Sequence, residues 1–334
     1  MITPTRLSYG VLAATIALAG LLHLGVPLLV LLFSYFALRQ LYFLTKKKWL
    51  ALILFGVVVA GITAATVYFA RTAILALPDV ADTSIPSASA WAQKRQIELP
   101  FTDFESLRQA VVDTLGQEAQ YLRNVANFAK SAAAAIVFSI LGIVAAGSLF
   151  YKTGLDPYRG THRLKNNLYS ICCDKVSTRF RDFYRSFATV MGAQITISLV
   201  NTALTGIFLV AVRLPHAPLL IAVTFLCGLV PIVGNLASNT VIVFVALTVS
   251  LKLAIAALVF LILIHKLEYL LNSKIIGDRI RNPVWLTLIA LILGERLMGI
   301  PGLILAPVVL NYLRVEMLTV EVPRAPEVVE SLNR

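Results

Sequence analysis

Apolar residues in this chain form long runs that are separated by short polar stretches. A helix needs about 20 predominantly apolar residues to cross the hydrocarbon core of a bilayer, and several runs approach or exceed that length. We therefore predict an all-α, polytopic transmembrane protein with about six full spans and two broken, re-entrant helical hairpins. The expected full spans are 7–24, 26–44, 49–70, 132–150, 187–212 and 253–272.

The run 217–251 is too long for one crossing and carries the polar, helix-breaking stretch LVPIVGNLASN near its middle. As one straight helix it would measure roughly 52 Å, whereas the hydrocarbon core is ~30 Å thick. Proline lacks an amide hydrogen and glycine tolerates unusual backbone angles, so Pro231 and Gly234 mark the place where the chain folds back. We predict a hairpin whose tip lies at membrane depth, covered by protein or by a wet cavity.

The run 284–313 repeats this pattern in the opposite orientation. An apolar arm, 284–293, meets the polar stretch Gly294-Glu295-Arg296, where we predict the break. Further helix-breaking residues interrupt the second arm at Gly299, Pro301, Gly302 and Pro307. We predict a second hairpin that opens from the cytoplasmic side. Paired, Gly/Pro-interrupted segments in opposite orientation indicate the substrate site of a transporter.

Charge sets the expected orientation of these spans. The formal net charge is +12, and membrane proteins concentrate Lys and Arg in cytoplasmic loops beside their helix ends. The basic loops are 46–48 and 151–186, so both are expected in the cytoplasm together with the N- and C-termini. Aromatic residues interleave with the arginines of 151–186, which predicts an interfacial helix that faces lipid headgroups. Because the basic residues of a membrane protein gather beside its helix ends, the positive charge does not predict a nucleic-acid-binding fold, on which it would form a basic stripe.

The same pattern divides the chain into consecutive parts. The external part is expected to hold a loop over 79–90 and an amphipathic helix that starts at a capping box of Thr102 and Glu105. The parts are 1–70 (scaffold helices), 71–130 (external segment), 131–186 (fourth span and basic loop), 187–314 (transport core with both hairpins) and 315–334 (cytoplasmic tail).

Neutral polar residues gather at the first hairpin and on the span before it. Broken helix ends place free backbone groups beside side-chain amides and hydroxyls, which suits the binding of a solute near mid-membrane. The predicted substrate-binding residues are Pro231, Gly234, Asn235, Ser238, Asn239, Gln194 and Asn201. Gln194 and Asn201 share one helix face, and for these two a role in hydrogen bonding between helices is an open alternative.

The second hairpin supplies the candidates for ion coupling or gating. These are Glu295, Arg296, Gly299, Pro301 and Gly302. An ionisable residue at membrane depth is functional by default, but Glu295 and Arg296 are equally well explained as a solvated pair at a tip that reaches water. His265 and Glu268 lie three residues apart near a predicted cytoplasmic helix end, where we expect them to be solvated.

No residue pattern in the chain predicts a cofactor, a metal site or an enzyme. The sequence has no P-loop, HExxH or GxSxG motif, so a self-sufficient ATP-driven pump is excluded. Cys172 and Cys173 are adjacent but have no further cysteine or histidine close by in the sequence, whereas a zinc site needs four ligands.

Short motifs in the second half of the chain are LVPIVGN at 229–235, SKIIG at 273–277 and GIPGLILAPVVLNYLR at 299–314, and LFYKTG at 149–154 ends the fourth span. In these motifs, and in the order of its elements, the chain resembles the autoinducer-2 exporter family of bacterial permeases. Asn235 and Ser273 stand where that family usually has proline. The resemblance implies export of small polar solutes from bacterial cells, a homo-oligomer, and a mobile core that contains the hairpins.

We therefore predict an exporter in the bacterial inner membrane that moves a small polar solute, such as an autoinducer-2-like signal, by alternating access. Its expected partners are the lipid bilayer, the solute, further copies of the chain, and a proton or sodium as coupling ion. One alternative, which the resemblance implies for some members, is a sodium or lithium/proton antiporter. The other is a non-transporting membrane scaffold or signalling protein that docks partners through 71–130 and 151–186.

Overall fold

The structure is a computed structural model that describes residues 4–22, 24–93, 118–151, 168–231, 233–275 and 283–319. Within these residues every regular element is an α-helix. In chain order the helices are α1 (Pro4–Leu21), α2 (Gly25–Thr45), α3 (Lys48–Gln93), α5 (Glu118–Tyr151), α6 (Leu168–Ala211), α7 (Ala217–Gly228), α8 (Val233–Val249), α9 (Leu251–Ile275), α10 (Val284–Met298) and α11 (Ile300–Leu318).

Many of these helices have the length and composition of membrane spans. In the described part of the chain, the segments long and apolar enough to cross a bilayer are Gly25–Thr45, Lys48–Thr72, Lys130–Tyr151, Tyr169–Ala211 and Ile300–Leu318. Large apolar side chains such as Val57, Ile62 and Val144 are more than 60% exposed, as expected for surfaces that face lipid. The prediction of an all-α, polytopic transmembrane protein is therefore confirmed.

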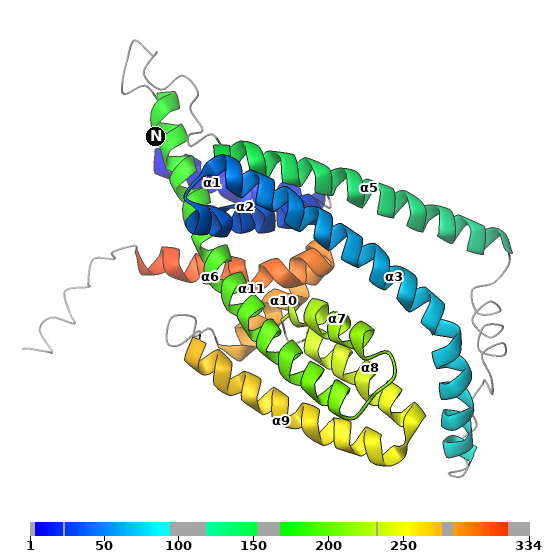
Figure 1. Ribbon diagram of the computed structural model, residues 1–334. Helices are drawn as coiled ribbons and strands as arrows, with labels where there is room; N and C mark the ends of the chain where they lie inside the picture. The colour runs from blue at the N-terminus through cyan, green and yellow to red at the C-terminus, as the bar shows by residue number, and fades with distance from the viewer. Residues whose placement is uncertain are drawn as a thin grey trace, which may run out of the picture.

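Two helices are longer than predicted. α3 continues to Gln93, so the prediction of a loop over 79–90 is wrong. A proline inside a helix removes one hydrogen bond, which a kink accommodates without ending the helix, and α3 changes direction in its second half (Figure 1). α6 begins at Leu168, so the second half of the predicted basic loop and the fifth span form one continuous helix. The amphipathic helix predicted to start at Thr102 begins outside the described residues.

The two broken segments both reverse direction, but the second does so later than predicted. α7 ends at Gly228 and α8 begins at Val233, with Pro231 in the turn between them. α10 continues through Gly294-Glu295-Arg296 to Met298, so the break predicted at these three residues is wrong. The reversal occurs at Gly299, whose φ of 64° favours glycine. α11 then runs through Gly302 and Pro307 without a break, which also corrects the prediction for this arm.

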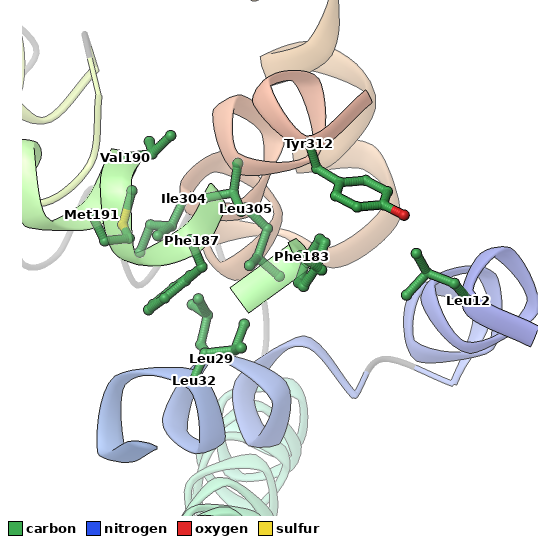
Figure 2. Packing of buried hydrophobic residues seen from close by; sticks show 11 residues of the cluster. Leu12, Leu29, Leu32, Phe183, Phe187, Val190, Met191, Ile304, Leu305 and Tyr312 are labelled. Carbon is green, nitrogen blue, oxygen red and sulfur yellow. The ribbon is translucent and has the colours of Figure 1, made fainter. Parts of the chain in front are cut away.

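Helix α6 connects the N-terminal helices to the hairpins. It runs from the side of α1 and α2 past α11 to the α7–α8 hairpin and α9 (Figure 1). One buried cluster joins α1, α2, α6 and α11 around Phe187, and Figure 2 shows Leu29 and Leu32 of α2 facing this ring. A second cluster joins α6, α7, α8 and α9, and a third joins α2, α3 and α5. Because α6 contributes to the first two clusters, it packs against both hairpins.

Candidate substrate and coupling site

The first hairpin is closed by contact between the backbones of its two helices. A Cβ atom added at Gly234 of α8 would lie 1.6 Å from the carbonyl oxygen of Cys227. A Cβ atom added at Gly228, the last residue of α7, would lie 2.5 Å from Ser198 Oγ of α6. Only glycine permits approaches this close. The structure thus confirms that the chain folds back at the stretch predicted from Pro231 and Gly234.

Two side chains of α6 hydrogen-bond the carbonyl groups at the end of α7. Gln194 Nε2 donates to the carbonyl oxygen of Gly228 at 2.7 Å, and Ser198 Oγ donates to that of Phe225 at 2.9 Å. The last carbonyl groups of a helix have no intrahelical partner, and an unpaired polar group in apolar surroundings is costly. Gln194 therefore forms a hydrogen bond between α6 and α7, which is the alternative that the sequence left open for this residue.

Beside this tip, a carboxylate from α9 meets amide side chains from α6 and α8. Asn235 Nδ2 lies 2.7 Å from both Oε1 and Oε2 of Glu268, and the Asn201 side chain lies close to this carboxylate. The Glu268 side chain is 12% exposed, so the prediction that it is solvated is wrong. His265, whose Nδ1 lies 3.6 Å from Glu268 Oε2, is 71% exposed, as predicted. Two predicted site residues, Asn201 and Asn235, thus meet at a shielded acid.

Two side-chain oxygens on α6, one of them in this cluster, lack a partner among the described residues. Asn201 Oδ1 and Thr202 Oγ1 are buried and have no hydrogen-bond partner among the described residues. Ser238 is 1% exposed, and its Oγ donates to the backbone carbonyl oxygen of Asn235 at 3.2 Å. Asn239 is half-buried on the same helix. Because buried polar groups are normally paired, the unpaired oxygen of Asn201 is a candidate acceptor for a ligand at this cluster.

The cluster has the chemistry to bind a cation or a polar solute. Burying a carboxylate is costly unless it is paired or protonated, and Glu268 has neutral amide partners and one exposed histidine beside it. A proton or a small cation that prefers oxygen ligands would neutralise it. In the residues that the structure describes, no three His, Cys, Asp or Glu side chains gather as a metal centre would require.

The second hairpin is also closed by contact between the backbones of its two helices. Near its turn at Gly299, α10 and α11 approach so closely that a Cβ atom added at Gly302 would lie 1.7 Å from the carbonyl oxygen of Gly294. Pro301 packs on the start of α2, since a Cβ atom added at Gly25 would lie 2.8 Å from Pro301 Cβ. The predicted gating residues Gly299, Pro301 and Gly302 therefore form the turn and its packing surface, and a gating role for them stays a prediction.

The charged residues of the second hairpin lie in two different surroundings. Glu295 and Arg296 are exposed on α10, and their coupling role stays a prediction. Near the end of α11, Glu316 forms an ion pair with Arg179 of α6 and accepts a hydrogen bond of 2.6 Å from the Tyr9 hydroxyl of α1. The Glu316 and Arg179 side chains are 13% and 16% exposed. This contact fixes the open end of the hairpin to two other helices.

Glu268 is the site residue that sequence reasoning missed. Its position near a helix end favoured a solvated side chain, and its partners lie 33 and 67 residues away in the sequence. The available signal was that Glu268 is a carboxylate within a predicted span, because such residues are rare and functional by default. That rule was applied to Glu295, which is exposed.

Comparisons with known proteins agree with the helical architecture. A family model described as "AI-2E family transporter" matches residues 9–319, which include both hairpins and the whole polar cluster. Among curated proteins, the chain is similar to "Putative transport protein YdbI" of Bacillus subtilis (strain 168), with 28% identity over 187 residues. This match covers 55% of the chain and 51% of the relative, so the chain spans about half the length of the curated protein that it matches.

Proposed function

The chain belongs to the AI-2E family of transporters, and from this premise we propose that it is a secondary transporter that exports a small polar solute by alternating access. The resemblance of its motifs suggests an autoinducer-2-like signal as the solute. The proposal includes a location in the bacterial inner membrane, cytoplasmic N- and C-termini, and assembly into a homo-oligomer. The solute site is the polar cluster of Asn201, Asn235 and Glu268 at the tip of the first hairpin.

One observation supports this site above the others. A shielded carboxylate and two amide side chains, one of them with an unpaired oxygen, converge where a helix is interrupted. Discontinuous helices are where secondary transporters bind substrates and coupling ions, because their ends offer backbone groups that a continuous helix uses internally. Gln194 and Ser198 pair some of those groups with α6, and these neutral hydrogen bonds are weak enough to exchange when the hairpin moves.

A second candidate function, sodium or lithium/proton antiport, is favoured by the same carboxylate. Glu268 is shielded, and in the described structure no Lys or Arg pairs with it, while Asn201 Oδ1 is a free oxygen beside it. A site of this composition can exchange a proton for an alkali cation, because either one neutralises the acid. The two candidates differ in what crosses the membrane with the cation.

Flux measurements on purified protein in proteoliposomes separate these functions. Candidate polar solutes are assayed with and without proton and sodium gradients, alongside proton release driven by sodium or lithium alone. We expect Glu268→Gln to lower transport by roughly 10- to 100-fold, because hydrogen bonds to a charged group contribute about 1.5–3 kcal/mol. The control is Lys266→Gln, which removes an exposed charge two residues away on the same helix.

The outcomes are distinct. Solute flux that depends on Glu268 supports the exporter, and cation-driven proton release without solute supports the antiporter. Full transport by Glu268→Gln, with an unchanged dependence on pH and sodium, would contradict the site. If the protein moves no solute or ion under any gradient while residues 71–130 capture a partner, the hypothesis of a non-transporting membrane scaffold or signalling protein is supported instead.

A further inference from the structure

A basic cavity lies between α2 and α6, away from the polar cluster of the first hairpin. Its volume is about 690 Å³. Four of the side chains that line it are cationic: Arg39 and Lys46 from the end of α2, and Arg181 and Arg185 from the first half of α6. No Asp or Glu is among the described residues that line it. Such a concentration of positive charge around a hollow favours an anionic ligand.

The cations are partly engaged by aromatic rings, which leaves their charge available. Arg39 lies 5.8 Å from the centre of the Tyr184 ring, and Lys46 lies 4.0 Å from that of Phe43. Arg185 Nη1 is 3.2 Å from Asp182 Oδ1, and this pair is solvent-accessible on the arginine side, with 71% of that side chain exposed. Cation–π contacts orient a cation without neutralising it. Among the described residues, four cations against the one carboxylate that pairs with them leave a net positive site.

Both helices change from apolar to basic at this cavity. In α2 the apolar run ends at Arg39, Gln40 and Lys46, just before the basic residues of the following loop. In α6 the basic first half gives way to the apolar second half after Arg185. These two boundaries are about 140 residues apart in the chain, yet they meet around one hollow. Their coincidence indicates that the cavity lies at the membrane–water interface, on the side where the basic residues collect.

We propose that this cavity binds the phosphate headgroup of an anionic phospholipid from that leaflet. Arginine and lysine provide the donors for a phosphate, and basic pockets between helices on the cytoplasmic side are suited to such headgroups. The aromatic residues Phe36, Tyr42 and Phe43 line the same cavity, and Tyr42 and Phe43 are exposed. They give the acyl chains an apolar exit, which a free phosphate does not need.

The bound lipid would bridge two parts of the molecule. Beside the cavity, α2 and α6 already meet through edge-on aromatic pairs, Tyr35–Tyr184 at 4.8 Å and Phe33–Phe187 at 5.1 Å between ring centres. A phosphate held by arginines from both helices adds a charged contact to this apolar one. The lipid therefore stabilises the position of α6, the helix that carries Gln194 and Asn201, relative to the N-terminal helices.

Native mass spectrometry of the full-length protein tests this proposal. The protein is incubated in detergent with phosphatidylglycerol or phosphatidylcholine of the same acyl chains, and the lipid that stays bound is measured. We expect the wild type to bind phosphatidylglycerol in preference to phosphatidylcholine. The double variant Arg39→Gln/Arg181→Gln should lower this preference by roughly tenfold, because each basic residue near an anionic lipid raises the affinity for that lipid about several-fold. Arg39→Lys/Arg181→Lys, which keeps the charges, should retain most of the preference.

The matched control removes two exposed charges elsewhere, in Lys130→Gln/Lys252→Gln, and should behave as the wild type. Thermal unfolding in phosphatidylcholine micelles checks that all variants are folded equally well. Wild type without a preference, a glutamine variant that keeps it, or a control that loses it equally would overturn the proposal. Displacement of phosphatidylglycerol by equimolar inorganic phosphate would also overturn it, because the site would then be one for free anions.

Discussion

In the first hairpin the tip is polar and is covered by side chains of α6, whereas in the second the tip is apolar and packs on the start of α2. Gln194 and Ser198 pair with backbone carbonyls of α7, and Asn235 reaches Glu268. The second hairpin, whose two backbones approach as closely at Gly294 and Gly302 as those of the first do at Gly234, is instead fixed at its open end by the Arg179–Glu316 ion pair.

This difference separates a hairpin suited to binding from one suited to support. Neutral hydrogen bonds to a helix end are individually worth about 1 kcal/mol, so they can be exchanged for contacts with a solute. A shielded ion pair and a tip packed tightly on the start of α2 are harder to rearrange, because packed interiors respond to small volume changes. The sequence pattern made the two hairpins look equivalent, but their neighbours give them different chemistry.

The largest effects are expected where the two hairpins are most alike. Gly234→Ala and Gly302→Ala each place a methyl group within 2 Å of a backbone carbonyl oxygen of the facing helix. Each should destabilise the protein by about 3 kcal/mol, at the upper end of overpacking effects, measured by thermal unfolding in detergent. Gly147→Ala is the control, since none of the residues that the structure describes lies within 4 Å of its added methyl group. If Gly302→Ala is as mild as the control, the second hairpin is not tightly closed.

A smaller loss of stability is expected when α6 no longer hydrogen-bonds the tip of the first hairpin. Gln194→Leu leaves the Gly228 carbonyl without its 2.7 Å partner, which should cost about 1–3 kcal/mol for a shielded, unpaired acceptor. Thr196→Val on the same helix removes only a hydrogen bond to the helix's own Gly192 carbonyl and should change stability by less than about 0.5 kcal/mol. Equal effects in the same unfolding assay would mean that the tip does not depend on α6.

A double-mutant cycle tests the ion pair of the second hairpin. For Arg179→Gln and Glu316→Gln we expect a coupling energy of about 1–2 kcal/mol, because both side chains are shielded and share Tyr9. The exposed Arg185–Asp182 pair, treated in the same way, should give less than about 0.5 kcal/mol. Coupling no larger than in the exposed pair would remove the distinction between an anchored and an exchangeable hairpin.

The smallest effect is expected at Glu295. Because its side chain is exposed on α10, we favour the solvated pair over a coupling role, so Glu295→Gln should change stability by less than about 0.5 kcal/mol and should leave the pH and sodium dependence of flux unchanged. The comparison variant is Glu268→Gln in the same proteoliposomes. A loss of ion dependence in Glu295→Gln alone would transfer the coupling role to the second hairpin and reverse the roles of the two hairpins.

The fold was largely predictable from the sequence, because helix length and apolar runs carry the relevant information. The turn around Pro231 was located correctly, since proline and glycine there interrupt a run that is too long to span. The break of the second hairpin was misplaced, because Gly294 serves close contact with α11 while Gly299 makes the turn. A glycine in the sequence does not distinguish these two uses.

The candidate site was only half predictable. Asn201 and Asn235 could be selected because amide side chains are unusual beside broken helices. Glu268 could not be joined to them, because helical periodicity gives the face on which a residue lies but not the helix that this face meets. The α6–α8–α9 arrangement that brings these residues together comes from packing around residues such as Leu209 and Ile242, whose partners are distant in the sequence.

The contact between Gly25 and Pro301 limits how the molecule can move. The start of α2 leaves no room for even one methyl group against the tip of the second hairpin, and Gly142 of α5 is equally close to Pro27. If the N-terminal helices moved as one body against both hairpins, these contact surfaces would separate. The tip of α10–α11 should instead move with α1, α2 and α5 as one rigid body. The surface that slides would then lie between this body and α7–α9, and α6 would lie along it, in contact with both sides.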